Sequence, residues 1–175
     1  MDQINQLREQ LPDVARDVKI NLQNVLQPGT LDAAQTFGVA LAVAYASRNA
    51  ALTRALLADA KAAGVEDAYV EDAKAAAILM GMNNIYYRFR HVVGKEEYSQ
   101  KPARLRMLRL KQVTTTQAYF ELLCLAVSAV NNCQACVQSH EAVVLEGGLS
   151  ADQVHDAVRI AAVVHSAAVA LETNL

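Results

Sequence analysis

The sequence predicts an all-α protein, and three observations support this fold class. Alanine dominates the apolar residues, glycine and aromatic residues are scarce, and apolar residues recur at steps of three and four. Alanine favours helices, whereas strands favour β-branched and aromatic residues. Small side chains also let helices pack closely, and 175 residues is a length typical of one domain. We therefore expect a single helical domain that spans residues 1–175.

The N-terminal half contains clear signals for helix ends. Pro12 suits the first turn of a helix, Thr30 and Asn49 can each cap one, and Gly64 is a helix stop. These signals predict helices over residues 2–10, 12–27, 30–47, 49–63 and about 66–87. The third of these segments is nearly all apolar in its second half, so we expect that helix to be buried.

Residues 88–111 differ from the rest of the chain. They contain eight of the sixteen Lys and Arg residues and only two acidic residues, and they include Gly94 and Pro102. We interpret them as an exposed basic connector with a short helix from about Arg104. The connector could bind an acidic partner, but a solvated face is the simpler explanation. The remaining helices are expected at about 116–131, 132–146 and 150–171, the last with Ser150 and Gln153 as a capping box.

The two halves of the chain resemble each other. Residues 37–49 match residues 120–132 at an offset of 83, and residues 70–73 match residues 154–157 at an offset of 84. This predicts two copies of one helical unit, at about 30–87 and 116–171, and the alternative is chance similarity between alanine-rich helices. The reactive residues Glu121, Cys133, Cys136 and His140 of the second copy correspond to Gly38, Ala50, Thr53 and Leu57 of the first. The chemistry is therefore expected in one copy only.

The stretch from Glu121 to His140 contains these reactive side chains. Asn132 is a candidate helix cap, which would place Cys133 in the first turn of the next helix. Cys133, Cys136 and His140 follow one another at steps of three and four, so all three project within roughly 60° around that helix. Two cysteines so placed can form a disulfide, and an imidazole one turn away can take a proton from a thiol.

The relation of Glu121 to His140 depends on a turn between their helices. If Asn131 and Asn132 form a turn, the helices run antiparallel, and Glu121 and His140 each lie roughly 12–17 Å from it. The carboxylate could then orient the imidazole toward Cys136. If one helix ran straight through the two asparagines, the two side chains would lie about 30 Å apart and could not interact.

Three interpretations of the cysteine pair are open at this point. We favour a redox-active dithiol over two buried small hydrophobic residues, and over a zinc site with His140 that lacks an evident fourth ligand. Cys124 lies in an apolar helix and is expected to be a core residue. We expect His155 at the surface and His165 in the core; His91 falls in the connector and is expected to be solvated.

Composition restricts the possible partners and location. The net charge of −2 gives no reason to expect binding to nucleic acid or to an anionic membrane. The N-terminus lacks an apolar run, and the longest uncharged segment, 122–139, contains four side-chain amides, so we expect neither a signal peptide nor a membrane span. The expected location is the cytoplasm, where a CxxC motif is more often redox-active or metal-binding than a structural disulfide.

The combination of Glu121, Cys133, Cys136 and His140 resembles the signature of the alkyl hydroperoxidase D (AhpD) family, within the carboxymuconolactone-decarboxylase-like superfamily. The similarity covers most of the chain, and it includes residues 11–22 (LPDVARDVKINL), 80–88 (MGMNNIYYR) and 120–122 (FEL). Some family members have a histidine just before the second cysteine, where this chain has Ala135. A possible second base is therefore missing from this chain, so we do not expect its activity to depend on pH in the same way as in those family members.

The resemblance implies a duplicated helical fold, usually a homotrimer, and an antioxidant thiol peroxidase that reduces alkyl hydroperoxides and the peroxiredoxin AhpC. No cofactor or metal is expected to be bound. Electrons would come from dihydrolipoamide on a lipoylated acyltransferase, which lipoamide dehydrogenase and NADH would recharge. The alternative function is a metal-binding or redox-sensing helical module without peroxidase activity.

The resemblance also implies roles for the four residues. Cys136 would be the nucleophile that becomes a sulfenic acid, and Cys133 would be the proton donor and resolving thiol. His140 would be the base, and Glu121 would orient it. The helix dipole favours Cys133 as the more acidic thiol, but at an exposed helix end it contributes under about 1 kcal/mol. We expect His140, the base next to Cys136, to have the larger effect and to make Cys136 the nucleophile.

Overall fold

The computed structural model describes residues 1–173, and within that range it contains helices and no strand. The helices are α1 (Asp2–Arg8), α2 (Arg16–Val25), α3 (Ala33–Ala46), α4 (Ala50–Ala62), α5 (Asp67–Val93), α6 (Glu96–Gln100), α7 (Gln117–Val130), α8 (Gln134–Glu146) and α9 (Ala151–Glu172), with short 3₁₀ helices η1 (Asp13–Ala15) and η2 (Leu108–Lys111). The predicted all-α class is confirmed. The last two residues of the predicted domain, 174 and 175, lie outside the described part.

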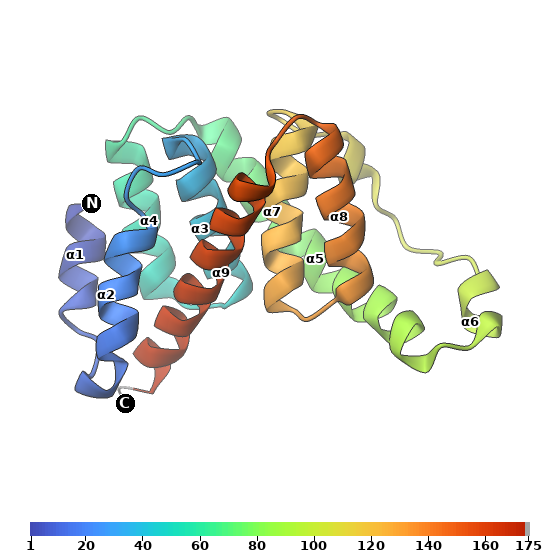
Figure 1. Cartoon of the computed structure of the whole chain (residues 1–175), viewed down its shortest axis with the longest axis horizontal. Helices are drawn as coiled ribbons and strands as arrows, with labels where there is room; N and C mark the ends of the chain where they lie inside the picture. Colours follow the sequence, from blue (N-terminus) through green and yellow to red (C-terminus); the bar gives the residue numbers. More distant parts are fainter. Residues whose placement is uncertain (174–175) are drawn as a thin grey trace.

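Two apolar helices, α3 and α7, form the centre of the fold. Residues 36–44 of α3 and 119–128 of α7 are buried without interruption, because other helices cover them on every side. α3 packs against α4, α5, α7 and α9, and α7 packs against α3, α5, α8 and α9. Figure 1 shows α1, α2 and α4 gathered at one end of the molecule and α5 leading to α6 at the other. The expectation that the apolar helix before Ser47 is buried is confirmed.

The predicted caps at Asn49 and Ser150 are confirmed, and the predicted cap at Thr30 is wrong. Asn49 caps α4 by accepting from the backbone N–H of Leu52 at 2.8 Å, and Ser150 caps α9 in the predicted box. Thr30 does not cap α3. Asp32 does so in a capping box with Gln35, and the Thr30 hydroxyl donates to Asp156 at 2.7 Å instead.

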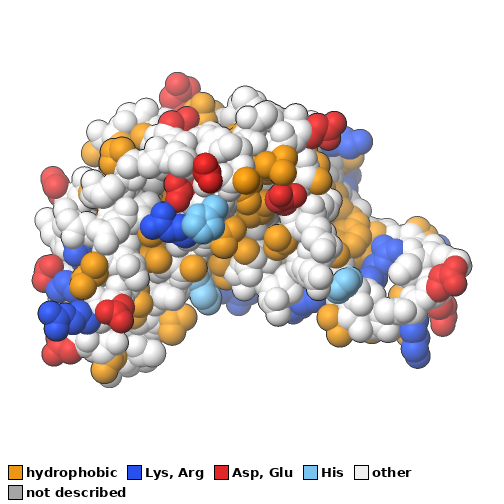
Figure 2. Space-filling view, viewed as in Figure 1, with side chains coloured by type: hydrophobic (Ala, Val, Ile, Leu, Met, Phe, Trp, Pro, Cys, Tyr) orange, Lys and Arg blue, Asp and Glu red, His pale blue; other side chains and the backbone are white. Residues whose placement is uncertain are grey.

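The basic connector begins later than the sequence predicted. α5 continues to Val93, six residues beyond the expected end, and stops at Gly94, which has a left-handed backbone with φ 62°. Residues 94–107, here called the arm, contain α6 and project from the body (Figure 1). Figure 2 shows charged side chains gathered at the tip of the arm. The helix expected from about Arg104 is also wrong, since Arg104 has φ 52° and η2 begins only at Leu108.

The positions at which some helices begin and end in the first part of the chain recur 84 residues later. The bounds of α3 and α4 and the start of α5 reappear 84 residues later in α7, α8 and the start of α9. The offset of 83 that the sequence predicted for the first part is therefore wrong, and Cys133 corresponds to Asn49 rather than to Ala50. Likewise Glu121, Cys136 and His140 correspond to Phe37, Leu52 and Leu56. Duplication itself stays a prediction, and in the corrected register too the first unit lacks the reactive groups.

α9 is long and apolar enough to cross a bilayer by length and composition alone, and it is the one such helix among residues 1–173. Its apolar side packs against α2, α3 and α7, with Ala157, Ile160, Ala161 and Val164 buried there. Asp156 and Arg159 form an ion pair at 2.8 Å within the same helix. Packing against these three helices accounts for the buried apolar residues of α9, whereas Val158 and Val169 are exposed.

The centre of the fold depends on a close contact between α3 and α7 at Gly38. A Cβ atom at this position would overlap the ring and hydroxyl group of Tyr119. The Tyr119 ring is fixed, because its hydroxyl donates to the Tyr69 carbonyl at 3.3 Å and its ring packs nearly perpendicular to the Tyr69 ring. Gly81 in α5 differs, since a Cβ there would meet nothing within 4 Å.

This difference predicts opposite effects for two glycine-to-alanine substitutions. Gly38→Ala should lower the free energy of unfolding by about 1–3 kcal/mol, because the Tyr119 ring has to move. Gly81→Ala should raise it by roughly 0.5–1 kcal/mol, because alanine is the better helix former and the site is open. Urea unfolding followed by circular dichroism measures both. A stabilising Gly38→Ala would show that the α3–α7 contact is not tight.

Candidate active site

A turn between α7 and α8 places the two cysteines. Asn131 ends α7, and Asn132 has a left-handed backbone with φ 53°, which asparagine tolerates better than most residues. The N–H of Asn132 donates to Ala129 O and the N–H of Cys133 donates to Ser128 O, both at 3.1 Å. This is the Schellman pattern of a helix end. The predicted turn and the antiparallel pair are confirmed, but Asn132 is not the cap of α8, because Cys133 itself occupies that position.

α5 holds this turn in place through three polar side chains on one face. Asn84 donates to Ser128 Oγ at 2.9 Å and accepts from Asn131 Nδ2 at 2.9 Å. Arg88 donates to Asn131 O at 2.6 Å, and the His91 ring contacts the Gln134 side chain at 3.2 Å. Two of these residues come from the predicted connector. His91 is exposed as expected, but it lies on a helix and has a partner.

Cys133 and Cys136 form a disulfide with a Cα–Cα distance of 5.3 Å. The two sulfur-bearing residues differ in exposure, since Cys133 is fully buried and Cys136 is 7% exposed. Cys136 and His140 both line a cavity of about 250 Å³, whereas Cys133 does not. An incoming molecule can therefore reach the disulfide from the Cys136 side.

The predicted contact between Glu121 and His140 is present. Glu121 Oε2 lies 2.5 Å from His140 Nδ1, and Glu121 Oε1 accepts from Gln117 Nε2 at 2.7 Å. Because a carboxylate only accepts, the His140 proton in the neutral ring resides on Nδ1 and the Nε2 lone pair is free. His140 lies one helical turn after Cys136, so this lone pair is suited to accept a proton from the Cys136 thiol.

The cavity beside Cys136 has a polar floor and mostly apolar walls. Tyr87, Met107, Leu110 and Ala135 line it together with Asn83, Cys136, Ser139 and His140. Among these eight residues only Asn83 and Cys136 are buried, and Ser139 is exposed. The cavity thus leads from the exposed Ser139 inward to Asn83 and Cys136. Its mostly apolar walls suit the apolar part of a bound molecule.

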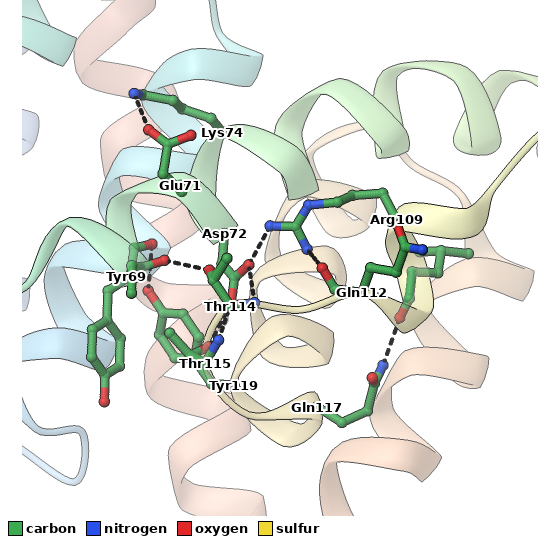
Figure 3. Close-up of polar contacts among 12 residues, drawn as sticks. Tyr69, Glu71, Asp72, Lys74, Arg109, Gln112, Thr114, Thr115, Gln117 and Tyr119 are labelled. Carbon is green, nitrogen blue, oxygen red and sulfur yellow. Dashed lines mark hydrogen bonds and ion pairs between the residues drawn. The ribbon is translucent and has the colours of Figure 1, made fainter.

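One wall of this cavity is held by a buried carboxylate, Asp72 of α5, which Figure 3 shows among its partners. Asp72 is fully buried and pairs with Arg109 at 2.6 Å. It also accepts from the backbone N–H groups of Thr114 and Thr115 at 3.0 Å each, and from Thr115 Oγ1 at 2.6 Å. These bonds fix the segment that contains Leu110 and leads into α7.

The same contacts determine the ionisation of Asp72. Burial by itself would raise the pKa of Asp72, but hydrogen bonds from Thr115, Thr114 and Arg109 outweigh it, and the pKa lies below its ordinary value of 3.8. Asp72 is therefore ionised at neutral pH, and its charge contributes to folding.

The other predicted residues lie outside this site. Cys124 is fully buried in the core as expected, and burial raises the pKa of its thiol. His155 is exposed as expected. The prediction that His165 lies in the core is wrong: it is exposed and its Nδ1 contacts Ser47 Oγ at 2.9 Å. The side of α9 that bears His165 faces outward. The spacing of apolar residues in the sequence did not show which side of this helix is buried.

In this structure the two sulfurs of the cysteine pair are bonded to each other. Over residues 1–173, no group of three or more His, Cys, Asp or Glu side chains is arranged to hold a metal ion. Since the sulfurs are joined in a disulfide, the arrangement matches the dithiol interpretation of the sequence.

Sequence reasoning missed Gln117 and Asn83. Gln117 could have been found, since it precedes Glu121 by four residues on an expected helix, a spacing at which side chains meet. Asn83 gave no usable signal. It is one of two adjacent asparagines in α5, and only the packing of α5 against α8 shows which of them lines the cavity.

Comparisons with known proteins show which family the chain resembles. Residues 96–173 match the model of the carboxymuconolactone decarboxylase family. The chain is similar over nearly its whole length to proteins named alkyl hydroperoxide reductase AhpD. One from Anaeromyxobacter dehalogenans (strain 2CP-C) is 64% identical over 98% of this chain and 92% of the relative. Others come from Gluconacetobacter diazotrophicus (50% identical, 97% and 92% covered) and Brucella suis (43% identical, 97% and 96% covered).

The Asp72 contacts predict a pH-dependent loss of stability. Asp72→Asn should lower the free energy of unfolding at pH 7 by roughly 2–4 kcal/mol, because Arg109 loses its partner and buried donors are left unpaired. The lowered pKa means that the stabilisation is complete above the ordinary value of 3.8 and is lost as the pH falls through the lower folded value.

Urea unfolding from neutral to acid pH tests this prediction. The difference between the wild-type and Asp72→Asn proteins should be constant near neutral pH and should begin to shrink only as the pH falls below about 4. Lys74→Met, which removes an exposed ion pair with Glu71, serves as a control that should change stability little. A wild-type advantage that persists unchanged into strong acid would contradict the role of the Asp72 charge.

Proposed function

Because the chain belongs to the AhpD family of alkyl hydroperoxide reductases, we propose that it reduces alkyl hydroperoxides through the Cys133–Cys136 dithiol. One observation carries this proposal: Cys136 of the disulfide and His140, which contacts Glu121, line one cavity, and the rest of its wall is mostly apolar. A thiol, a base and an apolar binding space are the parts that thiol-dependent reduction of an organic peroxide needs.

The reaction begins from the reduced protein. His140 Nε2 takes the proton of the Cys136 thiol, and the thiolate attacks the terminal oxygen of the hydroperoxide. The O–O bond breaks, Cys136 becomes a sulfenic acid, and the alkoxide takes the proton from His140 to leave as an alcohol. The Cys133 thiol then displaces water from the sulfenic acid and forms the disulfide. Two electrons pass from the dithiol to the peroxide.

The difference in exposure supports the division of roles between the cysteines. Cys136 lines the cavity, so a peroxide can reach its sulfur, whereas the buried Cys133 sulfur can react only with Cys136. The Cys136 sulfur is also the one that an external thiol can attack, so the mixed disulfide with an electron donor forms there. Cys133 is then the leaving thiolate that needs a proton.

Reduction of the disulfide requires a dithiol donor. We propose dihydrolipoamide on a lipoylated acyltransferase, recharged by lipoamide dehydrogenase and NADH, and a second role in reducing the peroxiredoxin AhpC. The lipoyl group ends a long flexible arm, which suits a disulfide that is open on one side of a narrow cavity. Attack by one thiol of the donor and closure by the other returns two thiols to the protein and leaves lipoamide oxidised.

The outer face of α5 supports an oligomer. Ile78, Ile85, Phe89 and Val92 recur at steps of seven, four and three and are between 47% and 75% exposed. An exposed apolar stripe of this kind is typical of a subunit interface. It borders a hollow of about 770 Å³ that contains none of the four predicted catalytic residues. We propose the homotrimer that the family resemblance implies, with this stripe in the subunit contact.

Substitution of each cysteine tests the assigned roles. Cys136→Ser should abolish peroxide-dependent turnover, because the attacking sulfur is lost. Cys133→Ser should still react once with a hydroperoxide and should accumulate a sulfenic acid on Cys136, which dimedone labelling followed by mass spectrometry detects. Cys124→Ser is the matched control, because that buried thiol takes no part. Full turnover by Cys136→Ser would refute the assignment.

A coupled assay tests the electron donor. NADH oxidation should depend on lipoamide, lipoamide dehydrogenase, this protein and a hydroperoxide together, since each supplies one step of the electron path. Adding AhpC should increase the rate if the second role holds. No donor-dependent rate with or without AhpC, or stoichiometric zinc in untagged protein with no reducible disulfide, would favour the alternative of a metal-binding or redox-sensing module.

A further inference from the structure

The strongest unexplained feature of the molecule is the side chain of Asn83. It lies in α5 and is 4% exposed, and its amide oxygen is a buried acceptor without a hydrogen-bond partner. No other such buried side-chain atom occurs in the part of the chain that the structure describes. An unsatisfied buried polar group costs about 1–3 kcal/mol, so its presence needs a reason.

The neighbouring asparagine shows that this is not a general property of α5. Asn84 is equally buried, but its amide donates to Ser128 and accepts from Asn131, both at 2.9 Å. Asn84 therefore has a structural role in holding the α7–α8 turn. Asn83 faces another direction, 100° around the helix, and lines the cavity beside Cys136 instead.

The position of Asn83 in the cavity relates it to the chemistry. Asn83 and Cys136 are the two buried residues of the lining, whereas Ser139 lies at the exposed mouth. The neighbouring lining residues Tyr87, Met107 and Leu110 offer mainly apolar surface. A molecule that enters far enough to touch the Cys136 sulfur is therefore in the same cavity as Asn83, the one amide side chain among the lining residues.

On this basis, and resting on the proposed function, we propose that the Asn83 amide binds the O–O–H group of the hydroperoxide while Cys136 attacks it. A hydroperoxide carries one O–H donor beside two acceptor oxygens, and an amide carries an acceptor beside a donor. The Asn83 oxygen can accept from the O–H, and its N–H₂ can donate to the oxygen that gains negative charge as the O–O bond breaks. The apolar lining residues then hold the alkyl group.

This role separates the two halves of the catalytic cycle. Reduction of a peroxide uses the Asn83 amide, but reopening of the disulfide by a dithiol involves only sulfur and proton transfers at Cys136 and His140. A substitution that removes the amide should slow the first half-reaction alone. A residue that merely supports the fold would slow both halves and would lower stability.

The experiment measures both half-reactions in Asn83→Leu, with Asn83→Ala as a second variant should leucine not fit. Pre-reduced protein is mixed with hydrogen peroxide or tert-butyl hydroperoxide, and the loss of thiols is followed in a single turnover. We expect a rate constant about 10–100-fold below wild type for both peroxides, since both contain the O–O–H group. Oxidised protein mixed with dihydrolipoamide should regain thiols at the wild-type rate.

Stability supplies an independent readout. Asn83→Leu should keep or raise the melting temperature, because the substitution removes an unsatisfied buried acceptor. Asn84→Ala should lower it, because Ser128 and Asn131 lose their partner. Gln138→Ala, which removes an exposed amide from α8 outside the cavity lining, controls for general effects on the rate.

The outcomes distinguish a failure of the Asn83 inference from a failure of the proposed peroxide reduction. An unchanged peroxide rate in both Asn83 variants, equal slowing of both half-reactions, or destabilisation like that of Asn84→Ala would overturn the role of Asn83. If the wild-type protein itself failed to react with either peroxide, the proposed function would fail and this inference with it. A reactive wild type with an equally reactive Asn83→Leu would overturn the inference alone.

Discussion

The site depends on one constraint, the tight turn that joins α7 to α8. Asn132 takes a left-handed backbone there, and the N–H of Cys133 returns to the carbonyl of Ser128. This reverses the chain within three residues, so the two helices run side by side. Glu121 and His140, 19 residues apart in sequence, then meet at 2.5 Å. A longer or looser turn would change the height of α8 against α7, and because a hydrogen bond tolerates only a few tenths of an ångström, it would break this contact.

The helices around this turn differ in what they contribute. α7 is buried over ten consecutive residues, so Glu121 is held by the core itself and by Gln117. α8 has only two buried residues, Cys136 and Val144, and one of its sides borders the cavity. α5 supplies the polar contacts that fix the turn and also the wall at Asn83. Together these helices leave the Cys136 sulfur accessible from the cavity, while the core and the polar contacts of α5 hold the residues around it.

The offset of 84 residues allows the two helical units to be compared position by position. Asn49 caps α4 with its side chain, and the corresponding residue in the second unit is Cys133, which occupies the cap position without a side-chain cap hydrogen bond and instead forms the disulfide with Cys136. Leucines stand at the positions of Cys136 and His140 in the first unit, and a phenylalanine stands at that of Glu121. The first two helices of each unit are the same in length, 14 and 13 residues, and only the second unit has the four reactive side chains.

The sequence by itself determined the helical class, most helix ends, the CxxC–His spacing and the dependence of the Glu121 contact on a turn. These features are local, because helix propensity, caps and i, i+4 neighbours act within a few residues. Only the tertiary structure decided which side of each helix faces inward and where α5 ends. It therefore decided the exposure of His165, the use of Arg88 and His91 at the turn, and the choice of Asn83 rather than Asn84 for the cavity. Burial depends on residues far away in the chain, and no spacing within one segment encodes it.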